Sequence, residues 1–168
     1  MPTLILMRHA KAVREHEAAS DRARGLTGRG RRDAEEAGRT LRLQGYAPTA
    51  VHASNAVRTV ETAVIVGGLV ASEVEGRFVE ALYLAAPEMI WDDAMQAGAG
   101  AILMVGHNPG LHELVALLVE RSGDRSALAR NFLSDMPTAA WAAFDVEGGD
   151  LESTSARFLG GWTPPRDA

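Results

Sequence analysis

Two short, unbroken apolar runs place the strongest constraint on the fold of this chain. They extend from Leu4 to Met7 and from Ala101 to Val105. A strand with apolar residues at every position is typical of the middle of a parallel sheet, where both faces are covered. Sequence typical of a loop and then a helix follows each run. The two runs therefore predict βαβ units, in which helices cover a central sheet.

Helix signals alternate with these runs. One helix is expected from about 27 to 44, where Gly45 ends it. Its inward-facing residues are expected to be Ala34, Ala37 and Leu41. A second helix, over residues 87–98, is expected to open with Pro87, which suits the first helical position.

Two further helices are expected directly after strands. Asn55 is the expected N-cap of the first, and Gly67 followed by Gly68 would end it. Its expected inward face carries Val57, Val60 and Val64. Asn108 is expected to cap the other helix, with Pro109 at the first helical position. The buried stripe of that helix is expected to contain Leu111, Leu114, Val115 and Leu118.

The remaining strands have weaker signals. Residues 49–54 and 74–79 are predicted to join the parallel part of the sheet. Residues 139–147 and 153–160 are predicted to be late strands, paired antiparallel across the turn at 148–149. The order of elements predicts an α/β fold, a three-layer α/β/α sandwich with a mostly parallel central sheet.

Length and charge limit the class of protein. A chain of 168 residues is typical of one domain, and residues 160–168 are expected to form a loose tail. The net charge of −5 disfavours a nucleic-acid partner, and no apolar stretch is long enough to span a membrane. Cysteine is absent, which excludes disulfides and thiolate nucleophiles. No secretory signal is evident, so the cytoplasm is the expected location.

The charge is distributed unevenly along the chain. Between Arg8 and Arg32, eight Arg or Lys residues and three acidic residues give +5, which leaves −10 for the remainder. A solvated loop and helix face would explain this segment. A surface that attracts phosphate or an acidic partner would explain it equally well. Asp21 lies within this segment and is expected to be an ordinary surface carboxylate. The alternative is that it orients an arginine of the basic loop.

Nitrogen-bearing side chains follow three predicted strands. Arg8 and His9 end the first strand, Arg58 lies in the first turn of the helix after the second, and His107 follows the strand that ends at Val105. Ligands of open α/β sheets bind beyond the carboxyl ends of the strands, so these side chains are expected to share one pocket. Helix N-termini also point to that edge, and an anion is the expected ligand.

A phosphoryl group suits this set of residues. The guanidinium of arginine is planar, permanently charged and able to donate two parallel hydrogen bonds to phosphate oxygens. The chain has no Lys-Ser/Thr phosphate loop and no ladder of carboxylates, and His107 and His112 lack the spacing of a zinc site. The residues therefore predict phosphoryl chemistry with no obligatory metal and no cofactor.

Five stretches, in this order along the chain, resemble the histidine phosphatase superfamily, also called phosphoglycerate mutase-like. They read LILMRHAKA, RGLTGRGRRDAEEAG, ASNAVRTVETA, VEALY and MVGHNPGLHELV. The short chain and the segment SDRARGLT resemble the compact SixA-like phosphohistidine phosphatases, which lack large lid-forming insertions. The resemblance implies a phosphoglycerate mutase-like fold.

The resemblance also implies roles for individual residues. His9 would be the nucleophile that is transiently phosphorylated, and Glu80 would supply a proton to the leaving group. The implied phosphate contacts are Arg8, Arg24, Arg58 and protonated His107, with Ser54 and Asn108 in support.

Two positions depart from the pattern of the family. Ala10 stands where glycine usually follows the Arg-His pair, so the backbone beside the nucleophile has less freedom. Gly25 stands where relatives have proline, which bears on how Arg24 is aimed.

The resulting expectation is a metal-independent phosphatase with a phosphohistidine intermediate, acting on phosphohistidine or another phosphoprotein. A small-molecule phosphomonoesterase that uses the same site is one alternative. A phosphate-binding module that has lost turnover is the other.

Overall fold

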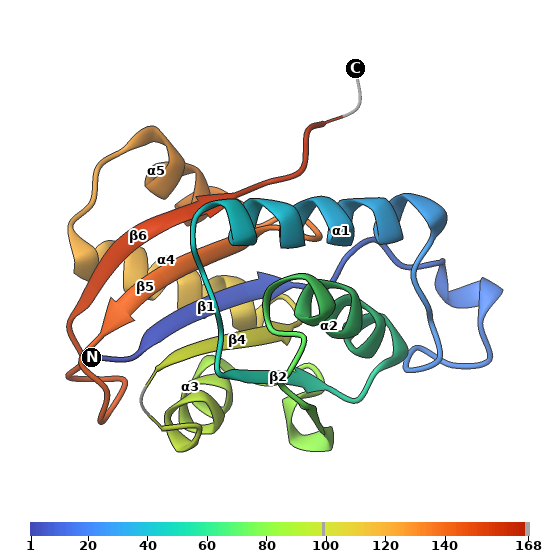
Figure 1. Ribbon diagram of the computed structural model, residues 1–168, viewed down its shortest axis with the longest axis horizontal. Helices are drawn as coiled ribbons and strands as arrows, with labels where there is room; N and C mark the ends of the chain where they lie inside the picture. Colours follow the sequence, from blue (N-terminus) through green and yellow to red (C-terminus); the bar gives the residue numbers. More distant parts are fainter. Residues whose placement is uncertain (99, 167–168) are drawn as a thin grey trace.

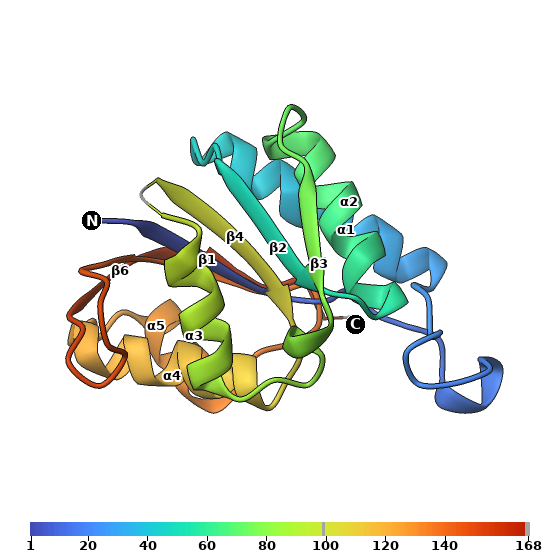
Figure 2. The same ribbon diagram turned by 90° about the horizontal axis from the view of Figure 1, so that it is seen from below.

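The computed structural model describes residues 1–98 and 100–166 of the chain. Within these residues six strands form one sheet: β1 (Thr3–Arg8), β2 (Ala50–Ser54), β3 (Gly76–Val79), β4 (Ala101–Gly106), β5 (Trp141–Val146) and β6 (Ala156–Trp162). Their order across the sheet is β3-β2-β4-β1-β5-β6 (Figure 1; β3 is labelled in Figure 2). The first four strands in this order are parallel, whereas β5 runs antiparallel to both β1 and β6. The predicted mostly parallel sheet, with two late antiparallel strands, is confirmed.

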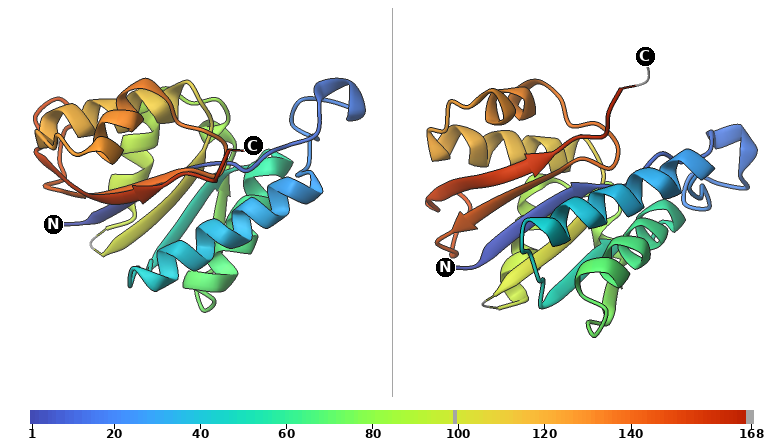
Figure 3. Two further views of the ribbon diagram at one scale, coloured as in Figure 1. Left: turned by 90° about the horizontal axis from the view of Figure 1, so that it is seen from above. Right: turned by 45° about the horizontal axis from the view of Figure 1, so that its top comes forward.

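Helices cover both faces of the sheet. They are α1 (Gly28–Leu43), α2 (Val57–Val70), α3 (Pro87–Gln96), α4 (Gly110–Ser122) and α5 (Ala127–Ser134). Helices α1 and α2 lie side by side on one face, and α3, α4 and α5 lie on the other (Figures 2 and 3). The three-layer α/β/α sandwich expected from the sequence is confirmed. None of the helices in the described residues is long and apolar enough to cross a bilayer.

The central strands are buried on both sides, which explains their unbroken apolar sequence. In β1, Leu4 and Leu6 pack into the core beneath α3, α4 and α5, whereas Ile5 and Met7 pack against α1 and α2. All four side chains are fully buried. Successive residues of a strand point to opposite faces, so a strand between two helical layers needs apolar side chains at every position.

Helix α1 closely matches the predicted helix. The Thr27 hydroxyl accepts a hydrogen bond from the backbone N–H of Gly30 at 3.0 Å, which caps the first turn. Gly45 follows the helix with a positive φ of 85°, a conformation that glycine adopts without strain. The predicted inward-facing residues Ala34, Ala37 and Leu41 are fully buried.

Helix α2 differs from the prediction at both ends and in the face it buries. It begins at Val57 without a side-chain cap from Asn55, and it continues through the two glycines to Val70. Val57 and Val64 are exposed rather than buried. The buried residues of the helix are Arg58, Thr59, Thr62, Ala63, Val66 and Gly67. Three polar side chains belong to the buried face because they take part in a network at the end of the sheet, and hydrophobic periodicity alone misses such a face.

The start of α4 also differs from the prediction. The helix begins at Gly110, and Asn108 does not cap it. Asn108 instead donates from Nδ2 to the carbonyl oxygen of Met136 at 3.1 Å. A side chain at position 110 would place its Cβ 1.9 Å from the carbonyl oxygen of Ala85, so only glycine fits this approach. The predicted buried stripe of α4 is confirmed, since all four of its residues are fully buried.

The C-terminal segment is more ordered than expected. Strand β6 extends to Trp162, which pairs with Trp141, so residues 160–162 belong to the sheet rather than to a loose tail. Residues 167–168 of the expected tail lie outside the described residues. Helix α5 was not predicted. Ser126 caps it, because its hydroxyl accepts a hydrogen bond from the N–H of Ala129 at 3.3 Å.

Candidate active site

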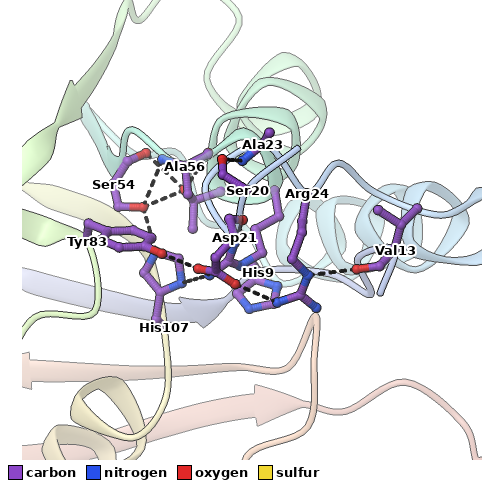
Figure 4. A network of polar contacts seen from close by, with 12 residues as sticks. His9, Val13, Ser20, Asp21, Ala23, Arg24, Ser54, Ala56, Tyr83 and His107 are labelled. Carbon is purple, nitrogen blue, oxygen red and sulfur yellow. Dashed lines mark hydrogen bonds and ion pairs between the residues drawn. The ribbon is translucent and has the colours of Figure 1, made fainter. Parts of the chain in front are cut away.

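The carboxyl ends of the parallel strands surround one pocket of about 280 Å³. Its lining residues are Arg8, His9, Asp21, Arg24, Arg58, Leu84, His107 and Asn108. Arg8 ends β1, Arg58 lies in the first turn of α2, and His107 follows β4. Figure 4 shows His9, Asp21, Arg24 and His107 gathered from these separate segments. The predicted convergence of Arg8, His9, Arg58 and His107 at one edge of the sheet is therefore present in the structure.

The imidazole of His9 is held in one tautomer. Its Nδ1 lies 2.7 Å from the carbonyl oxygen of Ala10, which can only accept, so Nδ1 carries the proton. The other ring nitrogen, Nε2, consequently has a free lone pair. Burial, reinforced by the positive charges of Arg58 and Arg8, lowers the pKa of His9 to about 3. His9 is therefore a neutral imidazole with an available nucleophilic nitrogen at physiological pH.

Ala10 fits beside His9 without strain. The described non-glycine residues with positive φ are Leu84 and Ala139, so the backbone of Ala10 lies in a region open to any residue. Its N–H donates to Oγ1 of Thr62 at 3.0 Å, and its side chain is fully buried. The departure from glycine at this position costs no conformational strain.

The buried Arg58 and the partly buried Arg8 both line the pocket. Arg58 is 3% exposed, and Arg8 donates from Nη1 to the carbonyl oxygen of Met136 at 3.1 Å. Within the described residues, Nε of each arginine is buried and has no hydrogen-bond partner. A buried donor without a partner is costly. Both guanidinium groups line the pocket, where an anion would meet two permanent positive charges.

His107 is oriented by Ser54. Its Nε2 lies 2.6 Å from Oγ of Ser54, while its Nδ1 accepts a long contact of 3.4 Å from Nη2 of Arg58. Because an arginine can only donate, Nδ1 is unprotonated and Nε2 carries the proton. Burial and the charge of Arg58 lower the pKa of His107 to about 4. His107 is thus neutral at physiological pH, in contrast to the protonated state expected from the sequence.

Asp21 lies in the pocket, whereas the sequence favoured a surface position. Its carboxylate accepts from Nη1 of Arg24 at 2.9 Å and from Nη2 of Arg58 at 3.0 Å, and it also accepts from the hydroxyl of Tyr83. The hydrogen bond from Tyr83 and those from the two arginines hold the pKa of Asp21 far below its ordinary value. The spacing of Asp21 and Arg24, three residues apart in a basic loop, was the one local signal of this arrangement.

Tyr83 was not predicted as a site residue. Its ring packs edge-on against the ring of His107, with centroids 5.4 Å apart, and the guanidinium of Arg22 lies over its face at 4.3 Å. The rings of His9 and His107 are also 5.4 Å apart. Tyr83 therefore ties the loop that carries Asp21 to the histidine pair.

Glu80 does not line the pocket. Its side chain is 74% exposed, and its Oε1 lies 3.2 Å from Nη1 of Arg22. Asn108 does line the pocket, and its Oδ1 is buried without a partner in the described residues. Nδ2 of Asn108 has a second hydrogen beyond the one given to Met136, so the amide can still donate to a phosphoryl oxygen, while its Oδ1 would accept from a donor such as water.

The charges of the lining residues define what the pocket can hold. Three arginines contribute +3, Asp21 contributes −1, and both histidines are neutral. The balance of +2 complements a dianionic tetrahedral group. No cluster of three or more metal-ligating side chains occurs among residues 1–98 and 100–166.

A second and larger cavity lies beside this pocket. It has a volume of about 740 Å³, and its lining residues include Lys11, Arg29, Asp33, Ser134, Asp135 and Arg166. The adjoining Met136 accepts hydrogen bonds from both Arg8 and Asn108 of the first pocket, so one loop borders both cavities.

Together, the fold and the pocket define an α/β protein with a positively charged, histidine-containing pocket at the carboxyl edge of its sheet. Residues 4–97 match the model of the histidine phosphatase superfamily (branch 1), and the chain belongs to this family. Its fold is the phosphoglycerate mutase-like fold. An uncharacterized protein of Mycobacterium tuberculosis is 33% identical over 162 residues, which cover 94% of this chain and 99% of that protein.

Solved structures of SixA proteins are similar over nearly the whole chain. A protein assigned as the phosphohistidine phosphatase SixA of Nakamurella multipartitia has a TM-score of 0.83 and 28% identity, over 97% of this chain and 96% of that chain. The protein histidine phosphatase SixA in complex with tungstate has a TM-score of 0.74 and 21% identity, over 95% of each chain. The latter likeness concerns the fold alone.

Proposed function

We propose that this protein is a metal-independent phosphatase that transfers a phosphoryl group to His9 and then to water, with a phosphohistidine protein as substrate. The hydrogen bond from Nδ1 of His9 to Ala10 carries the proposal, because it directs the lone pair of Nε2 toward the attack on phosphorus. The guanidinium groups of Arg8 and Arg58, which line the pocket, offer charged donors to the equatorial oxygens.

The same hydrogen bond serves both halves of the reaction. In the first step Nε2 forms a bond to phosphorus as the bond to the leaving nitrogen breaks. In the second step water attacks phosphorus, and His9 departs. Because Nδ1 keeps its proton throughout, His9 departs as neutral imidazole and needs no further acid. The proton of the attacking water passes to the released phosphate or to solvent.

The placement of the carboxylates favours a phosphohistidine substrate. A phosphorylated imidazole that carries a proton on its other nitrogen also departs as a neutral ring, whereas an aliphatic alkoxide needs a proton donor. Asp21 is held ionised by Arg24 and Arg58, and Glu80 is paired with Arg22 outside the pocket. The residues therefore suit cleavage of a P–N bond better than cleavage of an alkyl ester.

Two further observations support the proposal, the first for the phosphoryl group and the second for a protein substrate. The SixA structure with tungstate is a protein of this fold that binds a tetrahedral oxyanion. The cavity of about 740 Å³ beside the pocket has the volume of a sizeable ligand, within the range of about 300–1,000 Å³ typical of binding sites. A small phosphoester would leave that cavity unused, whereas the chain around a phosphorylated histidine would reach it.

Hydrolysis of a phosphohistidine protein, an aryl phosphate and an alkyl phosphate in excess chelator tests the proposal. We expect turnover of the first two, little turnover of the third, and an acid-labile phosphoryl group on the enzyme. His9→Ala should abolish both turnover and labelling, whereas the control His16→Ala changes an exposed histidine and should do neither. Fast turnover of the alkyl ester would instead favour a small-molecule phosphomonoesterase, and loss of activity with chelator would contradict the metal-independent mechanism.

A further inference from the structure

The carboxylate of Asp21 occupies terminal nitrogens of Arg24 and Arg58, two of the three arginines that line the pocket. Figure 4 shows it between Tyr83, Arg24 and the histidine pair. One carboxylate oxygen accepts from Arg24 at 2.9 Å, and the other accepts from Arg58 at 3.0 Å. A carboxylate bridging two guanidinium groups is a smaller version of the contact that the two groups would make with a phosphoryl anion.

The main chain strengthens this hold. Nη1 of Arg58 donates to the backbone carbonyl oxygen of Asp21 at 2.7 Å, so both terminal nitrogens of Arg58 contact this one residue. The hydroxyl of Tyr83 donates to the same carboxylate oxygen as Arg58. Asp21 is therefore held in the pocket through both its main chain and its side chain.

We infer that Asp21 competes with phosphate for Arg24 and Arg58, and that it thereby lowers the affinity of the site for free phosphate. An incoming phosphoryl dianion must either displace the carboxylate from Arg24 and Arg58 or share these arginines with a negative charge about one hydrogen-bond length away. Both cases reduce the affinity for the anion, by lost contacts in the first and by repulsion in the second.

This inference rests on the proposed function and narrows its substrate class. A site that holds the phosphoryl group weakly releases inorganic phosphate readily after the second step. Such a site must also gain binding energy from parts of the substrate remote from phosphorus. A phosphoprotein that contacts the neighbouring cavity can supply this energy, whereas a small phosphoester lacks the necessary surface.

Titration calorimetry with inorganic phosphate tests the inference without any need for turnover. At fixed pH and ionic strength, we expect Asp21→Asn to bind phosphate about tenfold more tightly than the parent protein. Glu17→Gln is the matched control, because it removes one negative charge from an exposed residue of the same loop. The control should stay within about twofold of the parent, as expected for an exposed charge screened by salt.

A second variant keeps the test decisive if Asp21→Asn does not fold. Tyr83→Phe deletes one hydrogen bond to the carboxylate with no change of charge, and should tighten phosphate binding about two- to threefold. Equal or weaker binding by these variants would overturn the inference, since it would mean that Asp21 serves to aim the arginines. Arg58→Ala should abolish phosphate binding. If neither the parent protein nor Asp21→Asn binds phosphate, the proposed function fails; if both bind it with equal affinity, the inference alone fails.

Discussion

Ser54 and His107 lie 53 residues apart in the sequence, and their side chains meet at 2.6 Å between Oγ and Nε2. The hydroxyl of Ser54 also lies 2.6 Å from Oγ1 of Thr59, which in turn donates to the backbone at the start of α2. This chain of hydrogen bonds fixes the orientation of the His107 ring. It also leaves Nδ1 of His107 directed toward Arg58.

Ser54→Ala should impair activity because it removes the hydrogen bond that orients His107. Without the hydroxyl, Nε2–H of His107 is a buried donor with no partner, and the ring can rotate away from the phosphoryl group. We expect kcat to fall about tenfold with little change in KM. Steady-state kinetics with an aryl phosphate would measure this, and Ser54→Thr, which retains a hydroxyl, should recover part of the loss. An unchanged kcat in Ser54→Ala would contradict a positioning role.

The two pocket histidines should make the protein less stable in acid. Their pKa values in the folded state are lowered to about 3 for His9 and about 4 for His107, whereas an unfolded imidazole has a pKa of about 6.5. Between these values the unfolded chain binds more protons, so the free energy of unfolding falls as pH drops below about 6.5. Each histidine contributes at most about 1.4 kcal/mol per pH unit.

Urea unfolding between pH 7.5 and 4.5 checks this expectation. His107→Gln should show a shallower loss of stability with acidification than the parent, because one of the two proton-linked groups is gone. Ring-nitrogen NMR should find His9 and His107 neutral at pH 5.5. A midpoint near 6.5 for either ring would refute the assigned direction of its pKa shift.

Disruption of the buried pair between His52 and Asp93 should affect stability and spare activity. Nδ1 of His52 lies 2.6 Å from Oδ2 of Asp93, and both side chains are 9% exposed, away from the pocket. Asp93→Ala leaves a buried imidazole without its partner, and should lower the free energy of unfolding by about 3 kcal/mol. Chemical denaturation measures the loss, while kcat/KM of the folded fraction should remain within twofold of the parent.

Gly30→Ala should destabilise the protein where α1 meets the loop that follows His9. A Cβ at this position would lie 2.1 Å from the carbonyl oxygen of Lys11, a backbone atom two residues beyond His9. We expect a loss of about 2–3 kcal/mol, typical of overpacking against an atom that cannot move aside. The matched control is Gly68→Ala in α2, where no atom lies within 4 Å; thermal unfolding should show it as stable as the parent or up to about 1 kcal/mol more stable.

A bulky side chain in the larger cavity should impair the hydrolysis of a protein substrate and spare that of a small substrate. Ser134 is exposed at the end of α5 and lines this cavity but not the pocket of His9. Ser134→Trp should raise KM for a phosphohistidine protein about tenfold and leave the hydrolysis of an aryl phosphate unchanged. Equal kinetics of the variant and the parent on the protein substrate would show that the cavity does not take part in docking.

The regular elements of the fold were largely predictable from local sequence. Leu4 to Met7 indicated a strand covered on both faces, and Ala34, Ala37 and Leu41 indicated the inward face of α1. Both patterns report burial directly, since an apolar side chain at a fixed period lies on the covered side of its element. The pattern failed in α2, where Thr59 and Thr62 are buried for their hydrogen bonds.

The sequence by itself determined the layered α/β fold and the meeting of Arg8, His9, Arg58 and His107, because strand direction alone decides which end of the sheet their residues reach. Only the tertiary structure decided which donor meets which acceptor. Asp21 reaches Arg58 across 37 residues and Tyr83 across 62, while Glu80 turns outward to Arg22. Side-chain pairing of this kind depends on how loops fold over the sheet, and no periodicity in the chain encodes it.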